Sequence, residues 1–150
     1  MLALFLLGAS PATAHTPLER TVPEAGAQLA AAPREVVLRF AEGVRPVPGG
    51  IRVFDEDGTR VDEARPHSVG GAVTLALPPL TKGAYVVSWR VVSADGHPVR
   101  GAFTFRVGGV GDQTAAGRLA ERLLVSGTSK PEVSATAACS VPSPSRPWRS

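Results

Sequence analysis

The sequence predicts an all-β fold, an antiparallel β-sandwich with a single core. Apolar and polar residues alternate in several short segments, which is the pattern of strands that are buried on one face. Turn residues recur about every ten positions, and no helical period of comparable strength occurs between residues 15 and 108. At 150 residues, the chain has room for one domain of ordinary size with a leader and a tail.

Residues 1–14 have the features of a signal peptide. An apolar run at residues 2–7 is followed by Ala12-Thr13-Ala14, which fits the small-x-small rule of signal peptidase. The run is too short for a bilayer, which takes about 20 apolar residues. We therefore expect cleavage after Ala14, a mature chain that begins at His15, and a location in the periplasm or outside the cell. The alternative is that the run forms a buried N-terminal strand.

Five segments are predicted as strands or hairpins, at residues 36–40, 51–61, 72–77, 85–92 and 102–107. In the second segment, Asp57-Gly58 marks a tight turn and predicts a hairpin. Pro78-Pro79 ends the third segment because proline cannot donate to a strand ladder. The residues expected to share the core faces are Val36, Leu38, Phe40, Val73, Leu75, Leu77, Tyr85, Val87, Trp89, Val91, Phe103, Phe105 and Val107.

The charge distribution argues against nucleic-acid binding. The net charge is +3, but residues 15–108 carry 11 Lys and Arg against 10 Asp and Glu, so most of the excess lies in the tail. No basic stripe and no interleaving of aromatic with basic residues occurs. The single cysteine, Cys139, excludes an intramolecular disulfide and a cysteine-based metal site.

The composition changes at the glycine-rich segment 108–111, where we place the end of the domain. Residues 109–150 are expected to form a disordered tail, in which residues 118–125 could form a short helix. No apolar run near 18 residues follows residue 108, so we expect no membrane span.

Asp95 and His97 lie in a short loop between the two strongest predicted strands. In an extended backbone, residues i and i+2 point the same way, so both side chains can reach one ion. The other interpretation of this pair is a capped turn with a solvated histidine. His67 has no partner at metal-binding spacing and is expected to be a loop residue, and Arg90 and Arg100 are expected to be solvated charges.

Cleavage after residue 14 would add a chelate to this pair. His15 would offer its α-amino nitrogen and a ring nitrogen to one metal ion. Together with His97 and Asp95, it forms a nitrogen and oxygen set that suits tetragonal Cu(II). Zinc remains an alternative because imidazole and carboxylate bind it as well.

Several segments together resemble the CopC copper-resistance family over about residues 15–108. These segments are His15-Thr16-Pro17-Leu18, Val22-Pro23-Glu24-Ala25-Gly26, Leu38-Arg39-Phe40-Ala41-Glu42 and the run 83–105, which contains Ser93-Ala94-Asp95-Gly96-His97-Pro98.

The resemblance implies a Greek-key β-sandwich or barrel, immunoglobulin-like or cupredoxin-like, that binds Cu(II) through His15, Asp95 and His97. Glu42 matches a glutamate that lies near the copper in some members, where it would be an outer ligand or a hydrogen-bond partner. The alternative for Glu42 is a surface charge at a strand end. The only methionine is Met1, so we expect no methionine-rich Cu(I) site. The implied partners are the copper ion and a CopD-like membrane copper-transport protein.

The predicted function is extracytoplasmic Cu(II) carriage, sequestration or delivery in copper homeostasis or resistance, without enzyme activity. One alternative is a copper oxidative enzyme, because such enzymes also use a terminal-histidine chelate. The short domain, an aromatic content of 5% and a fourth ligand from Asp95 argue against it. The other alternative is a metal-free immunoglobulin-like module, which copper would not stabilise.

Overall fold

The computed structural model describes residues 18–126, which form eight strands and one helix. In chain order, these elements are β1 (Leu18–Val22), β2 (Gln28–Leu29), β3 (Glu35–Phe40), β4 (Val44–Asp55), β5 (His67–Val69), β6 (Ala72–Ala76), β7 (Gly83–Ser93), β8 (Pro98–Val107) and α1 (Gln113–Ser126).

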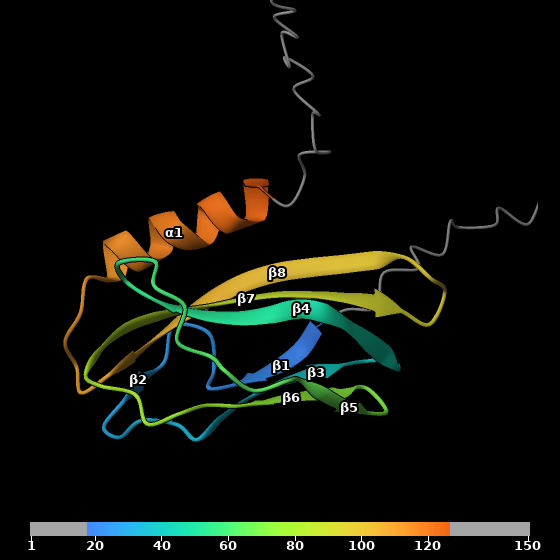
Figure 1. Cartoon of the computed structure of the whole chain (residues 1–150), viewed down its shortest axis with the longest axis horizontal. Coiled ribbons are helices and arrows are strands. Elements are labelled where there is room, and N and C mark those ends of the chain that lie inside the picture. Colours follow the sequence, from blue (N-terminus) through green and yellow to red (C-terminus); the bar gives the residue numbers. More distant parts are fainter. Residues whose placement is uncertain (1–17, 127–150) are drawn as a thin grey trace, which may run out of the picture.

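The strands form two four-stranded sheets that face each other (Figure 1). One sheet has the order β1-β3-β6-β5, and the other has the order β2-β8-β7-β4. Every pairing is antiparallel except that of β2 with β8, which is parallel and only two residues long. The predicted all-β sandwich is confirmed.

The core lies between the sheets and contains the residues that the alternation predicts. Twelve of the thirteen predicted core residues are buried, and Leu77 is half-buried because it lies just beyond the end of β6. Phe40 of one sheet meets Trp89 of the other edge-to-face, with ring centroids 5.3 Å apart. Aromatic packing therefore joins the end of β3 to the middle of β7.

The segment 51–61 differs from the predicted hairpin. It makes the expected turn, but its returning arm forms one bridge, between Phe54 and Arg60, and no second strand. The buried carboxylate of Asp62 accepts a hydrogen bond of 2.6 Å from the backbone N–H of Val53 and pairs with Arg60 at 2.7 Å. At this sheet edge, the carboxylate of Asp62 thus accepts the hydrogen bond from Val53 that a carbonyl of a neighbouring strand would otherwise accept.

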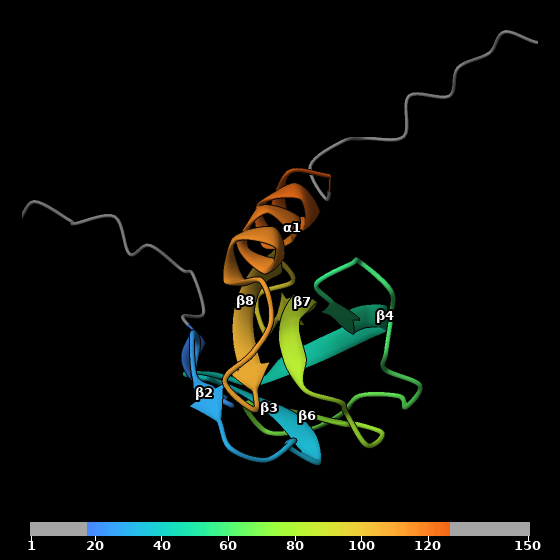
Figure 2. The same ribbon diagram turned by 90° about the vertical axis from the view of Figure 1, so that its left-hand side faces the viewer.

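The predicted disordered tail at residues 109–150 is wrong for its first part. The helix α1 packs on the outward face of β7 and β8, where Ala116 and Leu119 meet Ala84 and Val86 (Figure 2). The helix begins five residues before the predicted 118–125 segment and is about four turns long. Cys139 and the rest of residues 127–150 lie outside the described residues.

Asp112 caps the helix. Its carboxylate accepts hydrogen bonds from the backbone N–H groups of Thr114 at 2.8 Å and Ala115 at 3.0 Å. These two hydrogen bonds hold the pKa of Asp112 below its usual range, and the bond from Ala115 lowers it more than the bond from Thr114. In the part of the chain that the structure describes, no helix is long and apolar enough to cross a membrane.

Candidate metal centre

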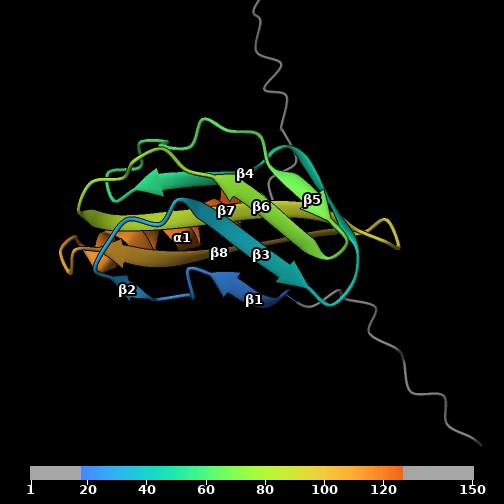
Figure 3. The same cartoon turned by 90° about the horizontal axis from the view of Figure 1, so that it is seen from below.

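One end of the sandwich brings together three segments that are distant in sequence. The β7–β8 loop at residues 94–97 lies beside the start of β4, because Val44 pairs with Ser93. The loop that precedes β4 leaves the end of β3, where Phe40 pairs with Leu18, the first residue of β1. The start of β1, the β3–β4 loop and the β7–β8 loop therefore share this end of the molecule, on the right in Figure 3.

The β7–β8 loop is a tight turn that places Asp95 and His97 side by side. The backbone N–H of Ser93 donates to the carbonyl of His97 at 3.0 Å, and that of Gly96 donates to the carbonyl of Ser93 at 3.0 Å. Gly96 has a φ of 88°, a conformation that favours glycine. The Nδ1 atom of His97 lies 2.9 Å from Oδ2 of Asp95. The two side chains therefore meet, but through a turn and not through the extended backbone that the sequence analysis assumed. The backbone N–H of His97 also donates to Oδ1 of Asp95 at 3.2 Å, so the geometry fits the alternative of a capped turn with an exposed histidine as well.

Ser93 supports this pair, although the sequence analysis did not select it. Its side chain is buried, and its hydroxyl contacts Oδ1 of Asp95 and lies 2.9 Å from the carbonyl oxygen of His97. The sequence signal that could have identified Ser93 is the alternation along β7, because Ser93 lies on the same core-facing side of the strand as Trp89 and Val91. A polar residue at an inward position needs a hydrogen-bond partner, and here the partner is the candidate ligand.

The electrostatics of the loop keep the carboxylate ionised. The hydroxyl of Ser93 and then the imidazole of His97 lower the pKa of Asp95 to about 2. An Nδ1–H of His97 that donates to this carboxylate leaves the lone pair on Nε2, the arrangement that is common among metal-binding histidines. The side chain of His97 is 74% exposed, so its Nε2 is accessible to an ion from solvent.

The structure unites only part of the predicted ligand set. Among residues 18–126, no three side chains of His, Cys, Asp or Glu lie close enough to hold a metal ion together. Glu42 lies exposed in the β3–β4 loop at the same end of the sandwich, but it does not form a group of three potential ligands with Asp95 and His97. His67 begins the edge strand β5 and is exposed. It pairs with Thr74 of β6, whereas Asp95 and His97 lie between β7 and β8 of the other sheet. His15 lies outside the described residues.

Two donors on one loop are fewer than a transition metal requires, so Asp95 and His97 alone do not form a complete metal site. Fold and loop together define a class: a small β-sandwich that carries an aspartate–histidine pair on the hairpin of its last two strands. The chain belongs to the CopC family, since residues 18–108 match the CopC domain. The resemblance predicted from the sequence is confirmed.

Individual relatives cover most of the described part. Copper resistance protein C of Pseudomonas syringae pv. tomato is 31% identical over 116 residues, which are 71% of this chain and 91% of that protein. Protein YobA of Escherichia coli K12 is 32% identical over 98 residues, 63% of this chain and 79% of that protein. Copper transport protein CutJ of Bacillus subtilis is 31% identical over 122 residues, 77% of this chain but 22% of its own length.

Solved structures of the family agree with the fold. The crystal structure of CopC from Methylosinus trichosporium OB3b matches with a TM-score of 0.56 and 38% identity, covering 62% of this chain and 93% of that chain. The structure of PcoC, a methionine-rich copper resistance protein from Escherichia coli, matches with a TM-score of 0.52 and 30% identity, covering 63% of this chain and 99% of that chain.

Proposed function

We propose that the mature protein is an extracytoplasmic carrier that binds one Cu(II) ion at the end of the sandwich. The ligands in this proposal are the α-amino and imidazole nitrogens of His15, a ring nitrogen of His97 and a carboxylate oxygen of Asp95. Glu42 is proposed as an outer partner. The observation that carries the proposal is the distance of 2.9 Å between Nδ1 of His97 and Oδ2 of Asp95, because it brings an imidazole and a carboxylate together on one loop.

The donor types support the divalent state of copper. Cu(I) prefers thiolate and thioether ligands, and the only methionine and the only cysteine of the chain are Met1 and Cys139, neither of which belongs to the domain at 15–108. Imidazole, amine and carboxylate groups suit Cu(II), which also ranks highest in affinity among divalent first-row metals. The names of the relatives support copper as the metal.

Chain geometry permits His15 to complete the site. His15 precedes Leu18 by three positions, and an extended chain spans at most about 3.5 Å per position, so the two Cα atoms can be at most about 11 Å apart. Leu18 pairs with Phe40 at the end of the sandwich that bears the β7–β8 loop. Cleavage after Ala14 is therefore part of the proposal, and it implies export to the periplasm or beyond.

The proposed role is carriage, sequestration or delivery, with no catalytic turnover. As a fourth protein ligand, Asp95 would fill the position that an oxidative copper enzyme leaves open for oxygen. The exposed imidazole suits an ion that must enter and leave. The partner in this proposal is a membrane copper-transport protein of the CopD type.

The test is a Cu(II) titration of the secreted protein, after mass spectrometry has identified its first residue. We expect His15 as the first residue and one Cu(II) per chain. His97→Ala should weaken binding strongly, whereas His67→Ala, which removes an exposed histidine from β5, should leave it unchanged. At a copper concentration of 100 times Kd, the wild type should gain about 2.7 kcal/mol in unfolding free energy.

Each alternative function has its own outcome in this test. A metal-free structural module would show no stabilisation by copper. An oxidative enzyme would consume a reductant and cleave polysaccharide when it is loaded with copper. Equal losses in the His97→Ala and His67→Ala variants would contradict the proposed site.

A further inference from the structure

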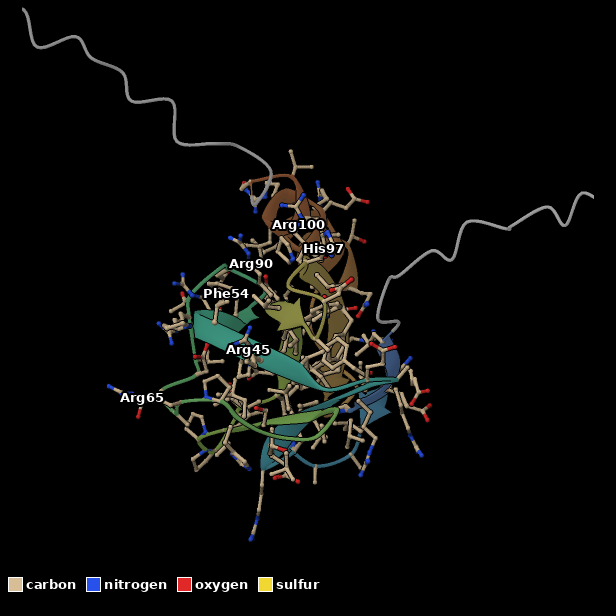
Figure 4. The ribbon with its side chains drawn as sticks, turned by 90° about the vertical axis from the view of Figure 1, so that its right-hand side faces the viewer. Arg45, Phe54, Arg65, Arg90, His97 and Arg100 are labelled. Carbon is tan, nitrogen blue, oxygen red and sulfur yellow. The ribbon has the colours of Figure 1, made fainter. Side chains whose placement is uncertain are left out.

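The outward face of β4, β7 and β8 carries four exposed arginines beside the β7–β8 loop. They are Arg45, Arg52, Arg90 and Arg100, and we call them the arginine face. Figure 4 shows three of them, Arg45, Arg90 and Arg100, on the side of the molecule that also presents His97. The core-facing residues of the same strands alternate with them, so their direction follows from the strand period.

Strand pairing concentrates their charge. Arg90 of β7 lies directly opposite Arg100 of β8. Arg52 of β4 pairs with Ser88, two residues from Arg90, and is therefore its diagonal neighbour on the same face. Like charges in directly opposite positions destabilise a sheet, so this arrangement does not serve the stability of the fold.

Carboxylates of the described residues do not pair with Arg45, Arg52 or Arg90. Within residues 18–126, none of Arg45, Arg52 and Arg90 forms an ion pair, and the Nε of Arg52 donates instead to the carbonyl of Gly49 at 3.0 Å. Arg52, Arg90 and Arg100 line a groove of about 350 Å³, and no Asp or Glu is among its described lining residues. Apolar side chains also line the groove, among them Phe54 from β4 and Leu123 from α1.

We propose that this groove binds an extended acidic segment of another protein. Guanidinium groups bind carboxylates through paired hydrogen bonds, and three of them along one groove match a segment with several Asp or Glu side chains. The apolar lining residues would contact the aliphatic parts of such a segment. A groove lined by guanidinium groups fits a polypeptide strand better than the flat surface of a membrane.

The position of the groove suggests what docking achieves. Arg90 lies three residues before Ser93, and Arg100 lies three residues after His97, so a bound segment lies next to the candidate metal centre. The partner would thereby be held where Cu(II) is received or delivered. This last step rests on the proposed function, whereas the docking itself requires no metal.

The test uses the full mature chain without copper and a fluorescent peptide of about ten residues that is rich in Asp and Glu. Binding is measured by fluorescence anisotropy at low ionic strength, and amide NMR shifts locate the peptide. We expect binding that salt weakens, with shifts on β4, β7 and β8. The double variant Arg90→Glu/Arg100→Glu should bind about ten-fold or more weakly.

The matched control is Arg39→Glu/Arg65→Glu, which changes the net charge equally at two exposed positions outside the arginine face. It should keep the wild-type affinity within about two-fold. If Arg90→Glu/Arg100→Glu does not fold, Arg90→Gln/Arg100→Gln replaces it, and a smaller loss of peptide affinity is then expected.

Three outcomes would overturn the docking proposal. These are an equal loss of peptide binding in the control, equal shifts on the arginine face from inorganic phosphate at the peptide's concentration, and tighter binding to phosphatidylglycerol vesicles than to the peptide. Since no copper is present, failure of the proposed copper function would leave this result unaffected.

Discussion

Replacing Ser93 by alanine isolates the group that supports the candidate metal centre. The hydroxyl contacts the carboxylate of Asp95 and the carbonyl of His97, while the backbone N–H of Ser93 separately holds that carbonyl at 3.0 Å. The hairpin should therefore stay closed in Ser93→Ala, and the main loss is the hydrogen bond to Asp95. For one buried hydroxyl, this loss costs about 1 kcal/mol of unfolding free energy.

The same hydroxyl is the first cause of the lowered pKa of Asp95, so the variant should raise this pKa from about 2 toward the ordinary 3.8. Because the pKa of the folded state lies below that of the unfolded state, the ionised carboxylate stabilises the wild type above pH 3.8 and loses this effect as the pH falls toward 2. In Ser93→Ala, this stabilisation should be lost over a narrower pH interval, because the pKa of Asp95 in the folded state lies closer to 3.8. Copper affinity should fall about 10- to 100-fold, because groups that orient a ligand have effects of this size.

The assay is an NMR titration of the Asp95 carboxyl carbon, with thermal unfolding and copper competition on the same samples. Ser88→Ala is the matched control, since Ser88 lies on the same strand but on its outward series, opposite Ala102. A carboxylate that keeps its pKa of about 2 in Ser93→Ala, or an equal loss of copper affinity in Ser88→Ala, would refute the reasoning.

Three further substitutions test the packing that positions the site, each by urea unfolding. Gly101→Ala should cost about 1 to 3 kcal/mol, because a Cβ there would lie 2.4 Å from the ring of Trp89. Gly117→Ala should instead stabilise by about 0.5 to 1 kcal/mol, because the helix offers open space at that position, and equal signs for the two glycines would contradict this account. Leu119→Ala should cost about 2 kcal/mol and speed amide exchange across 113–126, whereas no change would mean that the helix does not pack on the sheet.

Much of the sandwich is predictable because its strands are buried on one face only. The alternation in 36–40, 85–92 and 102–107 reports directly which side chains meet in the core. The two-residue strand β2 carries no such signal, since a period of two cannot be recognised in Gln28 and Leu29. Its parallel pairing with β8 depends on how the chain crosses between the sheets, which local patterns do not contain.

The helix was underestimated for a related reason. Its first turn contains Gln113 and Thr114, and Gly117 weakens the helical preference, so the apolar period becomes clear only from Leu119 onward. Only Ala116 and Leu119 are buried, on a face that β7 and β8 provide. Tertiary packing therefore decides where this helix begins, and composition alone suggested disorder.

The metal centre was predictable where it is local in sequence. The spacing of Asp95 and His97 on one loop already indicates a shared direction, and the structure joins them. Ser93 required knowledge of which face of β7 points inward, and the place of Glu42 depends on the pairing of β3 and β4 with their neighbours. His15 depends on proteolysis, which neither spacing nor packing determines.

The most direct test of the copper proposal is the Cu(II) affinity of the mature chain compared with that of a chain bearing one added glycine before His15. The added residue leaves every side chain in place and moves only the α-amino group away from the histidine ring. The account predicts that the mature chain binds one Cu(II) and that the extended chain binds it at least about 100-fold more weakly, since two donors of one chelate are separated. Equal affinity of the two chains would contradict it.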